Sequence, residues 1–129
     1  MTNEFDLVVI GAGPGGYVAA IRASQLGLKV ACVDRRPSLG GTCLNVGCIP
    51  SKALLSASKK YADAVNNLFE YGIETSGVNL NLKKMMAKKD SIVSDLTKGI
   101  EFLLKKNKVS WVTGKATIKS PSEVELWKE

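Results

Sequence analysis

The sequence predicts an α/β fold, in which a parallel βαβ sheet is followed by a long helical pair and the start of a β-ribbon. Two short apolar runs, 6–10 and 29–33, flank a segment with helical spacing of its apolar residues, and such runs are typical of buried parallel strands. Two long amphipathic segments follow, and the residues after 108 read as short strands. A chain of 129 residues forms one domain at most.

The first three elements are expected to form one βαβ unit. Strand 6–10 ends at Gly11, and the following helix ends near Gly27, because glycine commonly closes helices. The second strand, 29–33, closes with Asp34. The crossover between two parallel strands of one sheet is right-handed. The apolar residues of the helix are Tyr17, Ala20, Ile21 and Ala23.

Beyond this unit the pattern predicts a loop, two helices and three strands. A loop over 37–41 precedes the cysteine segment, and Pro50 begins a helix because proline fits the first helical turn. A connection over 72–81 leads to a second helix, whose apolar stripe covers 82–104. The apolar face of the first helix comprises Ala53, Leu54, Ala57, Tyr61, Ala64, Val65 and Leu68. The strands are expected at 109–113 and on both sides of a turn at 120–122.

Composition argues against several functions. Ten of the eighteen basic residues are lysines between Lys59 and Lys108, spaced along the polar sides of the two helices. Because no aromatic residues interleave with them and no nucleic-acid motif is present, we interpret the net charge of +6 as solvated helix faces. No apolar run is long enough to cross a membrane. We therefore expect no nucleic-acid partner, no membrane and no leader.

The three cysteines indicate a reducing compartment, where a close cysteine pair is catalytic or metal-binding rather than structural. A metal is not expected, because a tetrahedral site needs about four ligands and the chain has three Cys and no His. Cys32 lies in a predicted strand and is interpreted as a small core residue.

A dinucleotide fingerprint follows the first strand. In Gly11-x-Gly13-x-x-Gly16 the first glycine allows a tight turn, the second lets a pyrophosphate approach the backbone, and the third lets the helix pack against the strand. The phosphates are expected on N–H groups at the helix N-terminus, and Asp34 is expected to accept hydrogen bonds from the ribose. This predicts a Rossmann-like sheet. The fingerprint does not separate FAD from NAD, since both carry ADP.

A cysteine pair favours the flavin. Cys43 and Cys48 are separated by four residues, which closes a small ring if Gly47 lets the segment bend. The helix that follows favours a thiolate at Cys48, and Cys43, earlier in the loop, is expected to be the accessible thiol. A dithiol beside a dinucleotide is suited to passing electrons between a thiol substrate and a flavin. Lys52 either places positive charge near a reduced flavin or is a surface lysine. For Cys43 and Cys48 the alternative to a redox role is a disulfide that only stabilises the fold.

The segment from Gly40 to Lys52, Gly-Gly-Thr-Cys-Leu-Asn-Val-Gly-Cys-Ile-Pro-Ser-Lys, resembles the redox-active segment of the pyridine nucleotide–disulfide oxidoreductases. Within that family it most resembles the dihydrolipoamide dehydrogenase branch, whose members carry the Leu-Asn-Val and Ile-Pro-Ser-Lys-Ala-Leu-Leu wording. Gly-Pro-Gly-Gly-Tyr-Val-Ala-Ala-Ile-Arg-Ala also looks like this family, and the resemblance covers the whole chain.

The resemblance implies a role for each site residue. Cys43 would be the interchange thiol that reacts with dihydrolipoamide, and Cys48 the charge-transfer thiol against the flavin. The family normally has Glu where Asp34 stands, and Asp offers the same acceptor oxygens. The FAD contacts would be Gly11, Gly13, Gly16 and Asp34 for the diphosphate and ribose, Gly41, Thr42 and Lys52 for the flavin, and Gly114 and Ala116 for the adenine.

The resemblance also implies what the whole enzyme does. It would oxidise protein-bound dihydrolipoamide to lipoamide with NAD⁺, as a homodimer, with the dihydrolipoyl groups of 2-oxo acid dehydrogenase complexes as partners. Residues 1–129 would be a partial FAD-binding domain, lacking the NAD-binding and dimerisation domains and the family's catalytic His, so this chain alone is expected to be inactive. The expected location is the bacterial cytoplasm, with the mitochondrial matrix as the alternative.

Two other interpretations stay open at this point. One is a piece of a mercuric or other NADPH-dependent disulfide reductase, because mercuric reductases share much of the Cys segment. The other is a flavin-binding module without turnover. The gene sequence beyond Glu129 would discriminate among all three.

Overall fold

The computed structural model describes residues 3–127. Its sheet has three parallel strands in the order β1-β2-β3, with β2 in the centre. The strands are β1 (Leu7–Ile10), β2 (Val30–Asp34) and β3 (Ser110–Thr113). The predicted strands and their parallel arrangement are confirmed, with each start moved by one residue.

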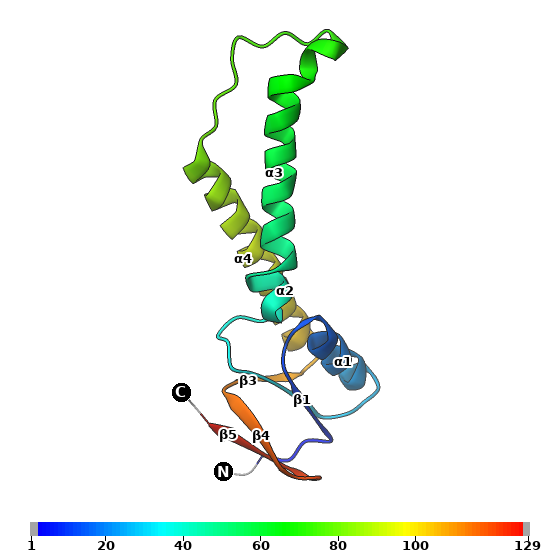
Figure 1. The fold of residues 1–129 in the computed structure, drawn as a ribbon. Helices are drawn as coiled ribbons and strands as arrows, with labels where there is room; N and C mark the ends of the chain where they lie inside the picture. Colours follow the sequence, from blue (N-terminus) through cyan, green and yellow to red (C-terminus); the bar gives the residue numbers. More distant parts are fainter. Residues whose placement is uncertain (1–2, 128–129) are drawn as a thin grey trace.

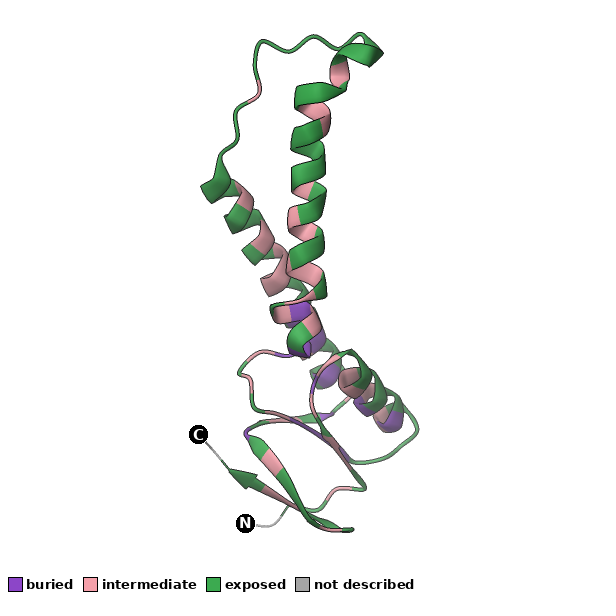
Figure 2. Ribbon diagram, in the orientation of Figure 1, coloured by how far each residue is buried: buried purple, intermediate pink, exposed green. Residues whose placement is uncertain are grey.

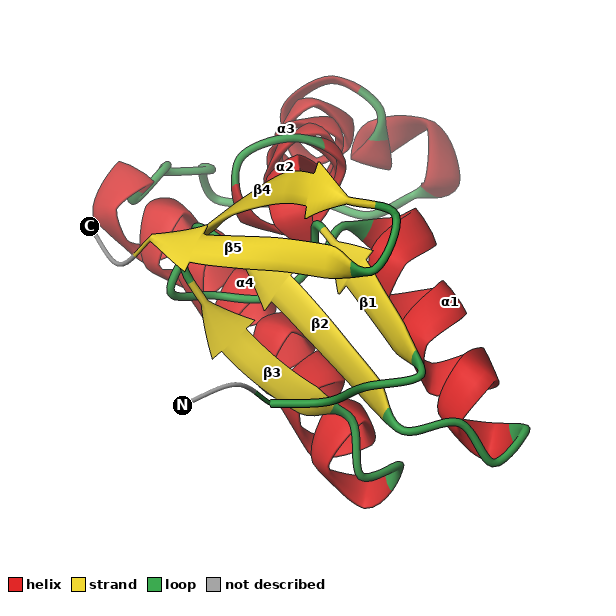
Figure 3. Cartoon of the chain, turned by 90° about the horizontal axis from the view of Figure 1, so that it is seen from below, coloured by secondary structure: helices red, strands yellow, loops and turns green. Residues whose placement is uncertain are grey.

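The central strand β2 is the most deeply buried element. Val30, Ala31, Cys32 and Val33 are each at most 2% exposed, because both faces of β2 are covered. Helix α1 (Pro14–Gln25) buries Ala20 and Ala23. In Figure 3, α1 and α4 lie on one face of the sheet, and a two-stranded ribbon crosses the other. Because β2 is buried on both faces, its sequence is a continuous run of four apolar residues and not an alternation of apolar and polar ones.

The ribbon consists of β4 (Lys115–Ser120) and β5 (Glu123–Trp127), which pair antiparallel. Their register shifts between Ile118 and Ser120, next to the turn. The predicted turn at 120–122 between two short strands is confirmed. Gly114 links the ribbon to the sheet, since its N–H donates to the Asp34 carbonyl at 2.9 Å.

The cysteine segment is helical, and Cys43, which was expected in a loop, lies in a helix instead. Helix α2 (Gly41–Asn45) comes first, and α3 (Cys48–Asn66) begins two residues before Pro50. Proline is compatible with this start, because the first N–H groups of a helix have no intrahelical partner. The two helices meet at Gly47, where an added Cβ would lie 3.0 Å from the Thr42 carbonyl oxygen.

Helices α3 and α4 (Leu82–Lys106) form the predicted pair, which projects away from the sheet (Figure 1). The short 3₁₀ helix η1 (Leu68–Tyr71) and the connection 72–81 close its far end. Burial is confined to the end near the sheet, where α4 buries Thr97, Ile100 and Leu104 (Figure 2). No residue of α3 is buried, so its predicted apolar face is at most half-buried; Tyr61 and Val65 are exposed.

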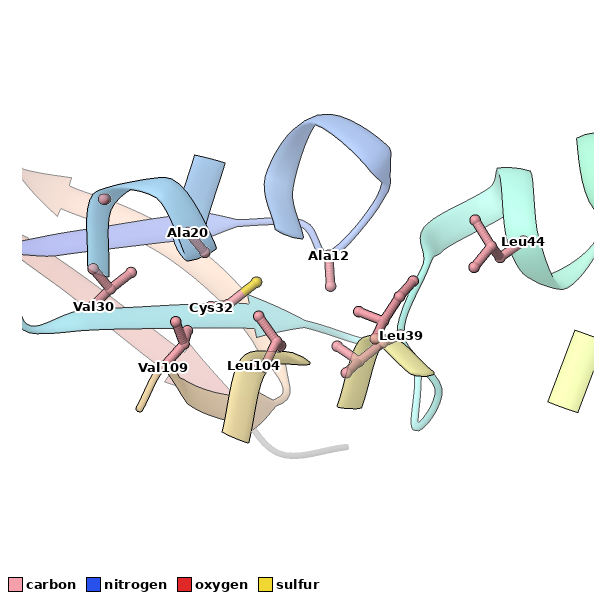
Figure 4. Close-up of a cluster of buried hydrophobic side chains, with 10 residues drawn as sticks. Ala12, Ala20, Val30, Cys32, Leu39, Leu44, Leu104 and Val109 are labelled. Atoms are coloured by element: carbon pink, nitrogen blue, oxygen red, sulfur yellow. The ribbon is translucent and has the colours of Figure 1, made fainter. Parts of the chain in front are cut away.

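The core connects the two parts of the molecule. Leu39 and Leu104 are almost completely buried, and together with Ala12, Cys32 and Leu44 they belong to one contiguous cluster (Figure 4). Leu39 belongs to the connection between β2 and α2, and Ala12 to the glycine turn after β1. The two segments that carry the sequence motifs are therefore packed into the same core.

Gly16 and Gly15 are neighbours in the first turn of α1 and differ in the space around them. An added Cβ at Gly16 would lie 1.7 Å from the Gly11 carbonyl oxygen, whereas one at Gly15 would have no atom within 4 Å. We expect Gly16→Ala to lower the free energy of unfolding by at least about 3 kcal/mol, because backbone must move. Gly15→Ala is expected to raise it by about 0.5–1 kcal/mol, since alanine favours the helix.

Urea unfolding followed by far-ultraviolet circular dichroism measures both variants against the wild-type chain. Equal effects of the two substitutions would contradict the packing of α1 on the β1 turn.

Candidate functional site

The glycine turn leaves the N-terminus of α1 open. Gly11 has φ +100°, a left-handed value that favours glycine. Gly13 occupies the N-cap position, and no side chain of the described residues caps this helix. Pro14 has no N–H, so the donors of the first turn belong to Gly15 and Gly16, and open space surrounds the Cβ position of Gly15. Unpaired N–H groups at a helix N-terminus suit a phosphate, and this turn fits the diphosphate of a dinucleotide.

Asp34 at the end of β2 holds this turn in place. Its Oδ2 accepts a hydrogen bond from the Ala12 N–H at 2.7 Å, and its Oδ1 accepts one from the Arg36 N–H at 2.9 Å. Each carboxylate oxygen has a further lone pair, so the predicted contact to a ribose stays compatible with this geometry. Sequence reasoning missed the bond to Ala12, because it joins residues that are far apart in the chain.

The glycine turn and the cysteine segment are in direct backbone contact. The Gly40 N–H donates to the Ala12 carbonyl at 2.9 Å. Gly41 has φ +59°, and a Cβ added there would lie 2.7 Å from Gly13 Cα. The close approach therefore requires glycine at position 41, whereas a Cβ added at Gly13 would lie 4.0 Å from Gly41 Cα, an ordinary contact distance. The structure thus brings together the residues predicted to hold the diphosphate and the flavin side.

The two site cysteines lie at the junction of α2 and α3 and are present as thiols. Cys43 is half-buried because α2 packs against the core, whereas Cys48 starts α3 and is exposed. Cys48 is thus the more exposed thiol in this chain, whereas the expectation that Cys43 is the accessible thiol concerns the full-length protein and stays a prediction. The neighbouring Cys48 thiol, by hydrogen bonding, raises the pKa of Cys43, and desolvation adds to the rise. The backbone of Cys48 and the positive charge of Lys52 act in the opposite direction.

The third cysteine has no part in this site. Cys32 lies in β2 with its side chain in the core. Burial, and secondarily the negative charge of Asp34, raises the pKa of Cys32 to about 11. It is a small core residue, as the sequence predicted.

The other predicted site residues occupy the same region of the chain. Thr42 and Lys52 are exposed in the first turns of α2 and α3. Gly114 is buried beside Asp34, and Ala116 is half-buried in β4. The predicted adenine contacts therefore lie next to the predicted ribose contact, although their roles stay predictions.

Residues 3–127 contain neither a metal-binding cluster nor a membrane-spanning helix. Within that range no three His, Cys, Asp or Glu side chains gather as a metal site would require. None of the helices there combines the length and the apolar character that crossing a membrane needs.

Comparison with known proteins identifies the family. Residues 5–129 match the pyridine nucleotide-disulphide oxidoreductases, and the chain belongs to this family. It is 60% identical over 125 residues to a leghemoglobin reductase of Vigna unguiculata. This alignment covers 97% of the chain and 24% of that protein. It is 58% identical over 125 residues to a mitochondrial dihydrolipoyl dehydrogenase of Dictyostelium discoideum and 56% identical over the same length to one of Arabidopsis thaliana. These alignments again cover 97% of the chain, and 26% and 25% of the two relatives.

The chain thus spans about a quarter of the length of these relatives. Family membership implies a flavin and a pyridine nucleotide as the redox cofactors. The expectation of a bacterial cytoplasmic protein is wrong, because the similar proteins of Arabidopsis thaliana, Pisum sativum, Dictyostelium discoideum and Schizosaccharomyces pombe are named as mitochondrial enzymes.

The interaction between the thiols predicts a pH effect. Removing the Cys48 side chain should lower the pKa of Cys43, because the hydrogen bond that raises it is lost. In Cys48→Ala the pH midpoint for alkylation of Cys43 by iodoacetamide should therefore move to lower pH. In Lys52→Ala it should move to higher pH, because the nearby positive charge is removed.

Mass spectrometry of the Cys43 peptide over a pH series measures both midpoints. The Cys32 peptide provides the internal control, since its thiol is buried and should react slowly throughout. Midpoints that coincide in all three proteins would contradict the contact between the thiols.

Proposed function

We propose that residues 1–129 are a partial FAD-binding domain of a dihydrolipoamide dehydrogenase, a flavoprotein that oxidises protein-bound dihydrolipoamide with NAD⁺. One observation carries the proposal: the backbone of the dithiol segment rests on the nucleotide-type turn, through Gly41 against Gly13 and Gly40 against Ala12. The high identity to dihydrolipoyl dehydrogenases over nearly the whole chain supports it.

The FAD contacts follow the geometry of the site. The N–H groups of the α1 N-terminus would hold the diphosphate between Gly11, Gly13 and Gly16, and Asp34 would receive the ribose. Gly41, Thr42 and Lys52 would line the flavin, and Gly114 and Ala116 the adenine. When bound, FAD accepts an electron pair from the dithiol and makes it available to NAD⁺.

The dithiol chemistry is a thiol–disulfide exchange. With Cys43 and Cys48 joined as a disulfide, a thiolate of dihydrolipoamide attacks the Cys43 sulfur, and the Cys48 thiolate leaves. The second thiol of the substrate, after losing its proton, displaces Cys43. Lipoamide is formed, and the protein disulfide has gained the electron pair.

The direction of this exchange has a physical reason. A disulfide is attacked so that the more stable thiolate departs. Cys48 is the first residue of α3, where the helix dipole stabilises negative charge, and the pKa of Cys43 is raised. This favours Cys43 as the interchange thiol and Cys48 as the charge-transfer thiol, in spite of the greater exposure of Cys48.

The remaining functions would belong to parts of the protein outside these 129 residues. The chain contains no His, so a catalytic His for the substrate thiols would come from elsewhere in the protein, and the NAD-binding site and the dimerisation domain are assigned to other parts as well. The partners would be the dihydrolipoyl groups of 2-oxo acid dehydrogenase complexes, and the location would be mitochondrial, as for the similar enzymes.

The chain alone is expected to show no dihydrolipoamide:NAD⁺ turnover, because proton transfer from the substrate thiols needs a placed base and hydride transfer needs a site for NAD⁺. Purified chain with added FAD, lipoamide in reduced form and NAD⁺ is assayed by NADH absorbance. Steady NADH formation proportional to the protein concentration would contradict this expectation.

The two thiols are expected to differ in the full-length protein. Cys43→Ser should abolish reduction of the protein by dihydrolipoamide yet keep a long-wavelength absorbance from the Cys48 thiolate to oxidised flavin. Cys48→Ser should lose that absorbance and leave an alkylatable Cys43. Absorbance spectra during anaerobic titration decide between the roles, and survival of the band in Cys48→Ser with its loss in Cys43→Ser would reverse the assignment.

A structural disulfide provides the contrasting expectation. If the pair only stabilised the fold, both substitutions would lower the melting temperature, and neither would change the flavin spectrum selectively.

A further inference from the structure

Asn45, the last residue of α2, makes hydrogen bonds outside its own helix. Its Nδ2 donates to the carbonyl oxygen of Leu39 at 3.0 Å and to that of Gly41 at 2.8 Å. Its Oδ1 accepts from the Ser38 hydroxyl at 2.6 Å. One side chain is thus bonded to Ser38 and Leu39 of the connection that leads from β2 into α2, and to Gly41, the first residue of α2.

These bonds use the amide fully. An asparagine amide has two N–H donors and one oxygen acceptor, and in Asn45 both kinds of group are engaged. Aspartate has the same size, but its ionised carboxylate has no donor and would face the Leu39 and Gly41 carbonyl oxygens. Alanine would leave both carbonyls without this partner. The position therefore requires the chemistry of an amide, and not only its volume.

Asn45 is hydrogen-bonded to the same stretch of chain that contacts the glycine turn. Gly40 follows Leu39 and precedes α2, Gly41 is the first residue of α2, and their φ values are +95° and +59°. The Gly40 N–H is bonded to Ala12, and Gly41 lies on Gly13. Leu39 and Leu44 anchor the same connection in the core. Asn45 thus holds the chain on both sides of Gly40.

We infer that Asn45 is a positioning residue, which fixes the dithiol helix α2 against the glycine turn and so sets the place of Cys43 relative to a bound dinucleotide. The inference rests on the proposed function for the redox role of the dithiol. The hydrogen bonds of Asn45 stand independently of that role.

Asn66 offers a matched control. It lies at the end of α3, and its Nδ2 donates only to Ala62, within its own helix. Asn66→Asp repeats the chemical change of Asn45→Asp at an exposed helix end. Ser38→Ala offers a milder variant, because it removes the hydroxyl bonded to Oδ1 and keeps both carbonyl bonds of Asn45.

The first measurement is amide hydrogen exchange of the full 129-residue chain at pH 7. In Asn45→Asp the protection of the Gly40 N–H should fall at least about tenfold, because loss of a buried partner and repulsion at two carbonyls open the turn. Protection of the Gly114 N–H, which is bonded to Asp34, should stay unchanged. Asn66→Asp should change neither amide, and Ser38→Ala should lower protection at Gly40 less than Asn45→Asp does.

Unchanged protection at Gly40, or an equal loss at Gly40 and Gly114, would overturn the inference, because the residue would then be dispensable or would act on the whole fold. If Asn45→Asp fails to fold, Ser38→Ala is used instead. Loss of protection at the Gly40 N–H but not at the Gly114 N–H then supports the inference, and any other result overturns it.

The second measurement is the equilibrium of the Cys43–Cys48 pair with glutathione, in which oxidised glutathione takes up the electron pair and yields two reduced molecules. Asn45→Asp should shift this equilibrium several-fold toward the dithiol, since α2 no longer holds Cys43 in place beside α3. An unchanged equilibrium despite lost protection at Gly40 would overturn the link to the dithiol. A wild-type chain that forms no Cys43–Cys48 disulfide would contradict the proposed function, and the exchange data would still decide the role of Asn45.

Discussion

The contact between the backbones of Gly13 and Gly41 is the constraint on which the arrangement of this molecule depends. Two segments that the sequence separates by β2 and α1 approach so closely that a single Cβ at Gly41 would lie 2.7 Å from Gly13 Cα. Packing at this distance leaves no room for a side chain at Gly41, whose backbone is also left-handed. Three hydrogen-bonding groups maintain it: the Gly40 N–H, the Asp34 carboxylate and the Asn45 amide.

The contact joins two different electrostatic environments. On one side, the N-terminus of α1 presents N–H groups that favour an anion. On the other side, the junction of α2 and α3 places two thiols together, with Lys52 one turn further along α3. The pKa of Cys43 is raised chiefly by its hydrogen bond with the Cys48 thiol, and this supports the proposed direction of the exchange. A flexible loop would not hold these two environments in a constant relation, whereas the short helix α2, which is fixed to the core through Leu44, does.

Much of this could be predicted from the sequence, for identifiable reasons. The strands were found because buried parallel strands are continuous apolar runs, and the glycine fingerprint follows directly from steric needs of a tight turn. The helical state of the cysteine segment was missed, because α2 is short and its sequence, with two leading glycines, has no amphipathic period. Its stability comes from Leu44 in the core and from Asn45, which are tertiary effects. The exposure of Cys43 and Cys48 in this chain depends on the same tertiary effects, since it is set by which helix packs inward.

The most direct test of the account is a nuclear magnetic resonance titration of the isotope-labelled 129-residue chain with FAD, which detects weak as well as tight binding. The account predicts that amide resonances of the α1 N-terminus, Gly15 and Gly16, shift together with those of Gly41, Thr42 and Cys43. Resonances at the far end of the helical pair, in η1, should not move. Shifts confined to the helical pair, or no shifts at saturating FAD, would contradict the claim that the dithiol segment and the glycine turn form one flavin-binding site.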